Sequence, residues 1–480
     1  MKSPFPRLVI AGLKGGAGKT TLSLGLIAAW RNKGRAVIPY KKGPDYIDAG
    51  WLSLAAGRLC YNLDPFLIGR EKIMSSFMGH FQDAECAVIE GNRGLYDGMD
   101  SSGTFSTAEL AKILKAPVVL IIDCTKATRT MGALVLGMQK FDKEIDIKGV
   151  VLNQIAGARH EKIIRETIER YCKVPVVGAI PKLGYEIISE RHMGLTSFQE
   201  HPDVEKAISL AGDIAAKYVD IDAIEGIAKG ATYLSGGRGE PPVQRTETPG
   251  RPVIGVLRDS AFQFYYPENM EELLNRGAEL LEISALTEKV LPDVDALYIG
   301  GGFPETNAIP LAKNNSFRRS LLIAVERGLP VYAECGGLMY LGEALLIGGK
   351  KYPMTGVFPI TFCLEKKPQA HGYTVVEVSG KNPFYAKGTL LKGHEFHYSR
   401  VADFGNRAGV TFSFKMKRGQ GIRQKSDGVC YRNVLATYTH LHAYGAPEWA
   451  EGLVKRAALY KKEKNKGVKE RKDIKTARRR

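Results

Sequence analysis

The chain has 480 residues, 44% of them hydrophobic, and a formal net charge of +17. Its length allows two or three domains with separate cores, and its longest apolar runs fall far short of the ~18 residues that a membrane helix needs. Seven cysteines without paired spacing, and an N-terminus without a signal-peptide pattern, favour a cytoplasmic protein in a reducing compartment over a secreted disulfide scaffold.

A glycine-rich loop follows the first expected strand. The apolar run from Arg7 to Ala11 precedes the string LKGGAGKTT at 13–21, and Thr20 to Trp30 has the pattern of a helix. Successive backbone N–H groups at such a turn can surround a phosphate. We therefore expect a nucleotide-phosphate site in which Lys19 reaches the outer phosphates and the Thr20 hydroxyl helps to hold Mg²⁺. The residues of this site are Gly15, Gly16, Gly18, Lys19, Thr20 and Thr21.

Acidic side chains follow the next strand-like runs. Asp45 and Asp48 lie in the string KKGPDYID at 41–48, Glu90 directly follows Val88 and Ile89, and Asp97 lies in the adjoining loop. Carboxylates at the carboxyl ends of parallel strands, beside a phosphate loop, are well placed to bind Mg²⁺. Helix capping and turn formation are the alternative explanation for Asp45, beside Pro44, and for Asp97, beside Gly98. They explain Glu90 less well, because a carboxylate flush after apolar residues needs a partner.

Apolar runs alternate with helix-like segments along both halves of the chain. This alternation predicts an α/β protein with a mostly parallel sheet covered on both faces. The composition turns to glycine, proline and charge near residue 240, and a fresh strand begins at Val253. We expect a nucleotide-binding domain at 1–235, a linker at 236–252, a second α/β domain at 253–455 and a basic tail at 456–480.

A cysteine lies between a strand-like run and a helix-like run in the second domain. Cys335 follows Leu329 to Tyr332 and precedes two glycines. A thiol on a sharp strand-to-helix turn is exposed, and the helix N-terminus is expected to lower its pKa. His440 and His442 are candidate general bases, and the glycines 300–302 are candidate oxyanion donors. A buried core thiol is the alternative, which these neighbours disfavour.

The remaining cysteines and two other histidines carry weaker signals. Cysteines at other positions lack such settings and are interpreted as packing residues. His394 and His397 resemble a metal motif, but the HExxH spacing is absent. We interpret both histidines as substrate-facing or structural, and not as zinc ligands.

The positive charge is concentrated in the tail. From Lys455 to Arg480 there are 13 lysines and arginines against 3 acidic residues, which accounts for +10 of the +17. Few large apolar residues accompany these charges. We favour a disordered solubilising extension over a nucleic-acid-binding arm.

These motifs together resemble those of the cobyrinic acid a,c-diamide synthase family along nearly the whole chain short of the tail. The strings that carry the resemblance are AG…GKTT at 11–21, GPDYID at 43–48, VIEG at 88–91, GLYDG at 94–98, RDSAF at 258–262, LYIGGGFPE at 297–305, the Cys335 turn and GHEFHYS at 393–399.

The resemblance implies a fold and a reaction. An N-terminal P-loop synthetase domain similar to dethiobiotin synthetase would be joined to a C-terminal, flavodoxin-like class I glutamine amidotransferase domain. Family members amidate the a and c acetate groups of a corrinoid, consuming glutamine and ATP with Mg²⁺. The implied partners are small molecules: a tetrapyrrole polycarboxylate, L-glutamine and ATP. A homodimer is left open, and neither a membrane nor a nucleic acid is expected as a partner.

The resemblance also implies residue roles. Cys335 matches the family nucleophile, and His440 matches the amidotransferase base within ATYTH at 436–440, where alanine replaces a usual glycine. The implied Mg²⁺ residues are Thr20, Asp48 and Glu90. Asp45, Asp48 and Asp97 match positions that handle substrate, phosphate or metal. Lys41 matches a phosphate-neutralising lysine, and Asn153 matches an adenine-reading asparagine.

Two departures leave alternatives open. Lys14-Gly15-Gly16 resembles partition and septum-site switch ATPases, in which Lys14 would act across a dimer, and Asn92-Arg93 replaces small or apolar residues. Hydrogenobyrinic acid or nickel-sirohydrochlorin could replace cobyrinic acid, because nothing in the sequence identifies the ring or its metal. A switch ATPase is the more distant alternative, since it would leave Cys335 and His440 without a purpose.

Overall fold

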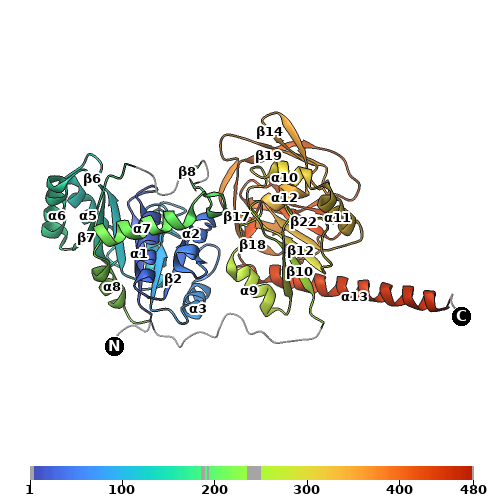
Figure 1. Ribbon diagram of the computed structural model, residues 1–480, viewed down its shortest axis with the longest axis horizontal. Coiled ribbons are helices and arrows are strands. Elements are labelled where there is room, and N and C mark those ends of the chain that lie inside the picture. Colours follow the sequence, from blue (N-terminus) through green and yellow to red (C-terminus); the bar gives the residue numbers. More distant parts are fainter. Residues whose placement is uncertain (1–4, 185–189, 192–193, 235–249, 478–480) are drawn as a thin grey trace. The chain divides into compact units, whose positions relative to one another are not determined.

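Short apolar runs of the N-terminal half form one parallel sheet (Figure 1). The computed structural model describes residues 5–184, 190–191, 194–234 and 250–477, and the chain divides into two units, Met1–Pro242 and Val243–Arg480. The strands of the first sheet are, in spatial order, β3 (Tyr61–Leu63), β2 (Val37–Lys42), β4 (Cys86–Glu90), β1 (Arg7–Gly12), β5 (Val118–Asp123), β6 (Ile147–Ile155) and β7 (Val176–Pro181).

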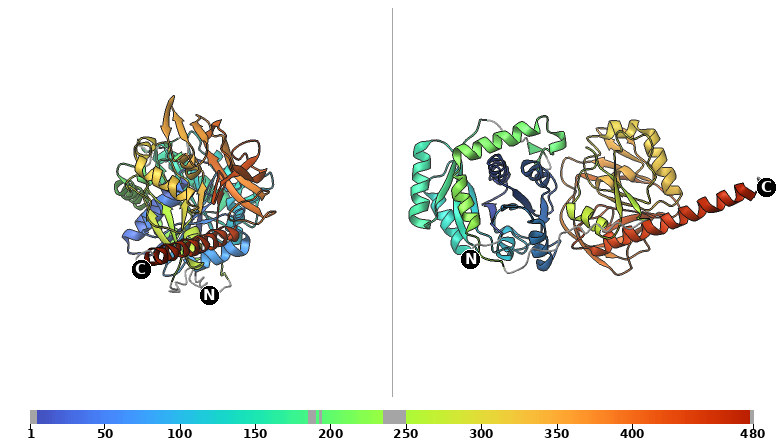
Figure 2. Two further views of the ribbon diagram at one scale, coloured as in Figure 1. Left: turned by 90° about the vertical axis from the view of Figure 1, so that its right-hand side faces the viewer. Right: turned by 60° about the horizontal axis from the view of Figure 1, so that its bottom comes forward.

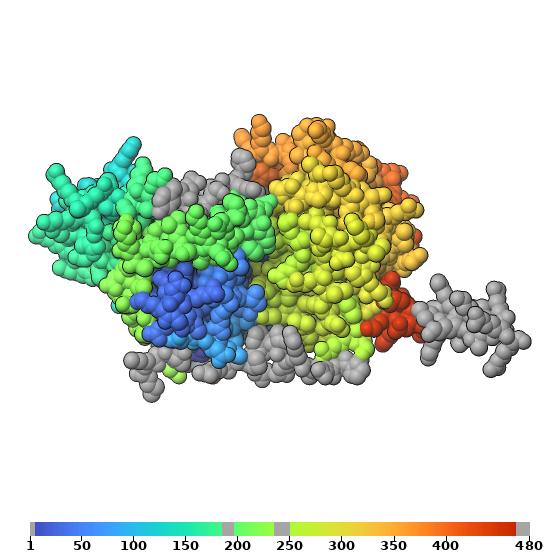
Figure 3. Space-filling model, in the orientation of Figure 1, coloured from blue at the N-terminus to red at the C-terminus, as the bar shows by residue number. Residues whose placement is uncertain are grey.

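Helices cover both faces of this sheet. One face packs against α1 (Lys19–Asn32), α2 (Ile47–Ala56), α7 (Val204–Tyr218) and α8 (Ile221–Lys229). In the space-filling view the green α7 segment lies against blue N-terminal residues (Figure 3). Right-handed crossovers place the other helices on the opposite face: α3 (Arg70–His80), α4 (Thr107–Ile113), α5 (Thr130–Phe141) and α6 (Ala158–Cys172). The hairpin β8 (Glu190–Arg191)–β9 (Gly194–Leu195) and a short 3-10 helix, Phe198–Glu200, precede α7.

The second unit contains a larger, mixed sheet. Its strands are, in spatial order, β11 (Glu279–Ile283), β10 (Val253–Leu257), β12 (Ala296–Ile299), β13 (Val331–Glu334), β22 (Val434–Thr437), β21 (Ser426–Tyr431), β20 (Thr411–Arg418), β17 (Ala370–Val378), β18 (Leu390–His397) and β23 (His440–Leu441). The first five are parallel and the rest antiparallel. A smaller sheet has the order β15 (Lys350–Pro353), β14 (Ala344–Ile347), β16 (Ile360–Leu364) and β19 (Ser399–Phe404).

The period-two alternation of the parallel strands divides the core of this unit into two layers. Leu297 and Ile299 face a cluster that includes residues of α11 (Asn315–Glu326), α12 (Gly336–Leu341) and the smaller sheet. The helix α10 (Ala308–Lys313) contributes to the same cluster. Tyr298 and Tyr332 face the opposite cluster, to which α9 (Pro267–Asn275) and α13 (Pro447–Ala477) contribute. The prediction of two α/β domains, the first with a parallel sheet, is confirmed.

The structure differs from the expected disordered tail. Helix α13 runs from Pro447 to Ala477, through most of the segment 456–480, and projects from its own unit in Figures 1 and 2. Its first turns are anchored by buried side chains such as Trp449 and Leu453. Farther along, Lys464 forms ion pairs with Asp293 at 2.9 Å and Asp295 at 2.8 Å. A helix started by a buried face can extend into charged sequence, because propagation costs less than nucleation.

Two expectations fall on residues that the structure does not describe. Of the predicted linker 236–252, residues 236–249 lie outside the described part of the chain, as do the last three arginines of the tail. Among the described residues, none of the helices is both long and apolar enough to cross a membrane.

Candidate functional site

A glycine-rich loop joins β1 to α1 at the carboxyl end of the strand. Gly16 has a φ of 70° and Gly18 a φ of 98°, left-handed values that suit glycine. The backbone of Gly15 and Gly16 is exposed, and Thr20 and Thr21 lie in the first turn of α1. The loop therefore offers backbone N–H groups and a helix N-terminus to a phosphate.

Lys19 and Asn153 contact the backbone of this loop. Lys19 Nζ donates to the Lys14 carbonyl at 3.2 Å, and burial, followed by the charge of Lys41, lowers the pKa of Lys19. Asn153 Nδ2, on β6, donates to the Ala17 carbonyl at 3.0 Å. The amide of Asn153 therefore braces the loop, a contact that the expected reading of adenine does not include.

Lys41 lies among the expected metal-binding carboxylates. β2 and β4 are neighbours, and Lys41 is paired in register with Glu90. The Lys41 ammonium is 2.6 Å from Glu90 Oε1, 2.7 Å from Asp48 Oδ2 and 4.0 Å from Asp45 Oδ2. Thr20 Oγ1 donates to Glu90 Oε1 at 2.9 Å. The structure thus brings residues from α1, α2 and two strand ends to one point.

Burial and mutual charge perturb each of these groups. Burial alone would lower the pKa of Lys41, but Asp48 and Glu90 outweigh it, so this pKa lies well above its usual value. Burial, with the neighbouring Asp48, raises the pKa of Asp45 to about 7. Burial likewise raises the pKa of Glu90, whereas at Asp48 the attraction of Lys41 overcomes burial and lowers the pKa. The cluster is a region of concentrated negative charge that one ammonium partly neutralises.

The chemistry of the cluster fits a divalent cation. Glu90 is fully buried, and its Oε2 atom has no hydrogen-bond partner. An orphaned carboxylate oxygen, beside a second carboxylate and a hydroxyl, matches the oxygen ligands that Mg²⁺ takes together with phosphates. Thr20, Asp48 and Glu90 are therefore suitable to hold the ion.

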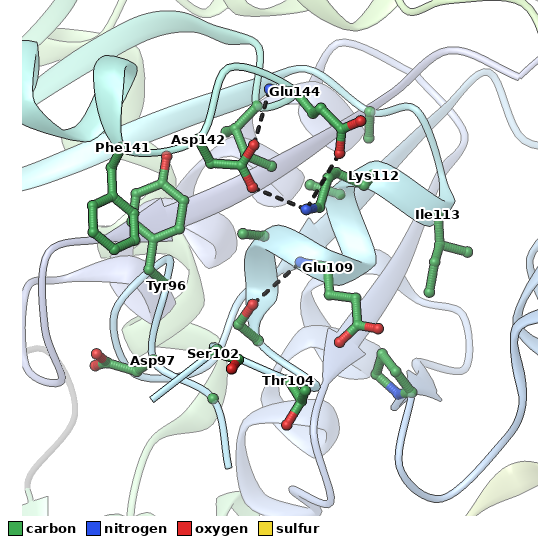
Figure 4. A pocket seen from close by; sticks show the side chains of 18 of the residues that line it. Tyr96, Asp97, Ser102, Thr104, Glu109, Lys112, Ile113, Phe141, Asp142 and Glu144 are labelled. Atoms are coloured by element: carbon green, nitrogen blue, oxygen red, sulfur yellow. Dashed lines mark hydrogen bonds and ion pairs between the residues drawn. The ribbon is translucent and has the colours of Figure 1, made fainter. Parts of the chain in front are cut away.

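Asp97 lies in a loop that packs against the phosphate loop and faces a cavity. Its Oδ2 accepts from the Gly94 backbone N–H at 2.9 Å. Figure 4 shows Asp97 at one side of a cavity of about 1360 Å³ that Arg93 also lines. Elsewhere in that cavity, Lys112 is already paired with Asp142 at 2.9 Å. Arg93 is exposed, so it is better placed than Lys112 to meet an anionic group.

Sequence reasoning did not single out Asp123 as a site residue. Asp123 ends β5, beside the phosphate loop, and lies 3.6 Å from the ammonium of Lys14. Thr125 donates to it at 2.6 Å, and this bond lowers the pKa of Asp123. The signal was present, because Asp123 is a carboxylate at the end of an apolar run, as Glu90 is.

The second site centres on Cys335, between β13 and α12. Its backbone has φ 47° and ψ −98°, a conformation that non-glycine residues rarely adopt. The Cys335 N–H donates to the Thr437 carbonyl at 2.7 Å, and the Gly337 N–H donates to the Gly300 carbonyl at 3.1 Å. A side chain at Gly336 would come within 3.0 Å of the Gly302 nitrogen. The predicted tight strand-to-helix turn therefore lies against the three-glycine segment.

The acidity of the Cys335 thiol differs from the expectation. Burial, followed by the negative charge of Glu305, raises the pKa of Cys335 far above its ordinary value, whereas the helix N-terminus was expected to lower it. Helix α12 spans only Gly336–Leu341, and Cys335 is only 6% exposed. The raised pKa favours a neutral thiol, whose Sγ lies 3.9 Å from the Phe396 carbonyl oxygen, and a neutral thiol needs a base to remove its proton before sulfur can attack.

The two candidate bases lie in different surroundings. His440 is stacked on His394 with ring centroids 4.8 Å apart, and a side chain at Gly301 would come within 3.3 Å of His440 Nε2. His442 instead has its Nε2 3.5 Å from Glu268 Oε1 and packs on Tyr266. The neighbouring glycine segment packs against the Cys335 turn, so the geometry favours His440 over His442 as the base.

The glycine segment and the remaining histidines have defined partners. The Gly300 N–H donates to Tyr265 Oη at 2.8 Å, so oxyanion donors would have to come from Gly301 or Gly302.

Both His394 and His397 are buried. Burial, with the charge of His440, lowers the pKa of His394 well below its usual value. Neutral His394 can therefore stack on His440 without repelling it.

A buried carboxylate that the sequence did not single out holds the loop that leads to His440. Asp427, on β21, accepts from Thr437 Oγ1 at 2.6 Å, from the Tyr438 N–H at 3.0 Å and from the Thr439 N–H at 3.2 Å. Burial raises the pKa of Asp427. Nothing in its local string, Ser426-Asp427-Gly428, distinguishes it from a turn residue, so only the fold reveals this contact.

Two family models match the chain, one in each half. Residues 8–191 match a model described as "CobQ/CobB/MinD/ParA nucleotide binding domain". Residues 253–447 match a "CobB/CobQ-like glutamine amidotransferase domain". The first range contains the phosphate loop and the carboxylate cluster, and the second contains Cys335 and His440.

Curated relatives match both halves at once. A protein of Magnetococcus marinus named cobyrinate a,c-diamide synthase is 43% identical over 94% of this chain and 97% of its own length. Proteins of the same name from Archaeoglobus fulgidus and Dehalococcoides mccartyi are 41% and 40% identical, over 94% of this chain and 98% of their own. A solved glutamine amidotransferase covers 42% of the chain and 98% of its own, with a TM-score of 0.30 and 21% identity, a likeness too low to bear on the fold.

Proposed function

The chain belongs to the cobyrinate a,c-diamide synthase family, and from that premise we propose that it amidates the a and c acetate carboxylates of cobyrinic acid. It is a glutamine-dependent amidating ligase with an ATP-binding P-loop domain. The observation that carries the choice of substrate is the full-length likeness to curated synthases of that name.

In the amidotransferase half, we propose that Cys335 is the nucleophile and His440 its base. The thiol proton passes to His440 Nε2 while sulfur bonds to the carboxamide carbon of glutamine. The same proton then goes to the leaving nitrogen as the C–N bond breaks, which releases ammonia and leaves a glutamyl thioester. Water hydrolyses the thioester to glutamate. The glycine segment supports this assignment, because Gly301 lies against His440 Nε2 and the adjacent Gly302 lies against Gly336 of the Cys335 turn.

In the synthetase half, we propose that the substrate carboxylate is phosphorylated by ATP. Ammonia then displaces phosphate from the resulting acyl phosphate and forms the amide. Bound Mg²⁺, held by Thr20, Asp48 and Glu90, would supply neutralising charge for the phosphates. Lys19 and Lys41 would bind the phosphate oxygens, and Asp45 and Asp97 would handle substrate or phosphate. The loop residues are Gly15, Gly16, Gly18 and Thr21, and Asn153 braces them and is proposed to read adenine.

Hydrogenobyrinic acid and nickel-sirohydrochlorin remain the alternative substrates. They present comparable carboxylates, and the residues of the two sites do not distinguish one ring from another. A switch ATPase that uses Lys14 is the remote alternative. The strained turn at Cys335 argues against it, because such strain is retained where the surrounding structure and its function require it.

The decisive experiment offers the three tetrapyrroles separately to purified protein with ATP, Mg²⁺ and glutamine, and follows the products by mass spectrometry. We expect a diamide from cobyrinic acid and little or none from the other two. A diamide formed only from another ring would reassign the substrate and keep the chemistry. No amide from any ring, with intact ATP binding, would contradict the proposal.

A further inference from the structure

Glu334 is a buried carboxylate for which the proposed mechanism has no role. It is the last residue of β13, directly before Cys335, and is 1% exposed. Strand alternation places it on the same side of the sheet as Tyr298 and Tyr332, behind the turn that presents the thiol. Burial of a carboxylate costs free energy, which hydrogen bonds or a nearby positive charge must offset.

The partners of Glu334 converge on His440. Glu334 Oε2 lies 3.3 Å from His440 Nδ1 and accepts from Tyr298 Oη at 3.3 Å. Glu334 Oε1 accepts from the Leu441 backbone N–H at 3.2 Å. One carboxylate therefore holds both the ring of His440 and the backbone directly after it.

The other ionisable groups around the His440 ring do not provide this contact. His394 stacks face to face with His440, and a histidine side chain is neutral or positive, so it offers no negative charge. Asp427 binds residues 437–439. Glu268 is paired with His442 at 3.5 Å. The negative charge of Glu305 raises the pKa of the Cys335 thiol.

We infer that Glu334 is a positioning residue that holds His440 in the tautomer and orientation needed to take the proton of Cys335. A carboxylate accepts only, so His440 Nδ1 carries the hydrogen and Nε2 is left with its lone pair, on the side where Gly301 lies. When Nε2 takes the thiol proton, the adjacent negative charge stabilises the imidazolium. This arrangement assembles a base and its orienting carboxylate from β13 and β23.

The test measures glutaminase activity and ammonium-driven amidation in the full-length protein. We expect Glu334→Gln to lower the glutaminase kcat by about 100- to 10,000-fold, since loss of an orienting carboxylate has effects of this order. KM for glutamine should change little, and amidation with ammonium chloride should persist. Glu334→Asp should recover part of kcat. The acid limb of the kcat/KM profile should move to lower pH in Glu334→Gln, because the imidazolium has lost its counter-charge.

Glu268→Gln is the matched control, because Glu268 is a buried glutamate paired with a histidine in the same unit. It should leave glutaminase kcat within a few-fold of wild type. The double variant Glu334→Gln/His440→Ala should be no slower than His440→Ala alone, since Glu334 acts through that ring. Equal losses in the two glutamate variants, additive losses in the double variant, or an unmoved pH profile would overturn the inference.

The role inferred for Glu334 rests on the proposed function, and two further results distinguish a failure of that role from a failure of the proposed function. If Cys335→Ala or His440→Ala keeps glutaminase activity, the proposed function fails. If both lose it and Glu334→Gln does not, only the role of Glu334 fails. Should Glu334→Gln also lose ammonium-driven amidation, Glu334→Asp decides: a lowered glutaminase kcat with ammonium-driven amidation kept supports the role, and an unchanged kcat overturns it.

Discussion

Individual side chains in the second unit have acidities that their sequence neighbours did not predict. Cys335 precedes a helix, yet burial and Glu305 keep its thiol protonated. His394 is buried, and its pKa lies well below the usual value. Cys335 and His440 could be proposed as site residues from the sequence because glycines and a short motif surround them. Sequence reasoning could not identify Glu334 or Asp427, whose partners lie 106 and 10–12 residues away along the chain.

The pH dependence of stability should report the buried neutral state of His394. The unfolded chain binds a proton at this residue below about pH 6.5, whereas the folded chain does not, so stability should fall as the pH drops. One such group contributes up to about 1.4 kcal/mol per pH unit below that value. Thermal melts between pH 5.5 and 8 should show a shallower acid-side loss for His394→Asn. Equal slopes in the wild type and in His394→Asn would contradict this account.

At the scale of elements, apolar runs predicted the parallel strands well. Each run in the first half became a strand, and the polar residues that follow these strands meet at one edge of the sheet. The antiparallel strands of the second unit were not predicted individually, although a run such as Thr411–Arg418 alternates polar with apolar residues, which is the pattern of a half-buried strand. The length of helix α13 was not predicted. The many charged residues of the tail favoured disorder, and anchoring residues such as Trp449 and Leu453 lie before the tail begins.

The anchoring of α13 should be measurable as stability. Leu453 is fully buried in the core of the second unit, so Leu453→Ala should lower the free energy of unfolding by about 2–5 kcal/mol through lost contacts and a cavity. Leu459 lies on the same helix but is 41% exposed. Leu459→Ala should change stability by no more than about 0.5 kcal/mol in denaturant titrations. Comparable losses in both variants would show that the helix is not anchored through this face.

At the scale of the whole molecule, each unit has a core and a site of its own. The phosphate loop and its carboxylates come entirely from the first unit, and Cys335, His440 and Glu334 come entirely from the second. Sequence reasoning recovered this division because each half carries motifs that are specific by themselves. It could not supply the contacts within each site, since these depend on which strands are neighbours.

Separate cores predict separate responses to ligands. In calorimetry, a non-hydrolysable ATP analogue with Mg²⁺ should raise the unfolding transition of the first unit and leave that of the second in place. At 100 times its Kd, a ligand stabilises its unit by about 2.7 kcal/mol. Lys19→Ala should abolish the shift, because Lys19 is proposed to bind the phosphates. Equal shifts of every transition would show that the two units unfold as one.

The buried, protonated thiol of Cys335 also has a consequence for oxidative damage. Peroxides attack thiolates and not thiols, and oxidation beyond sulfenic acid is irreversible without dedicated repair. In the proposed mechanism the sulfur stays protonated until His440 takes its proton, so it would present little target to such oxidants between turnovers. The same desolvation that would make the proposed nucleophile dependent on a base would thus protect it from peroxides while no substrate is bound.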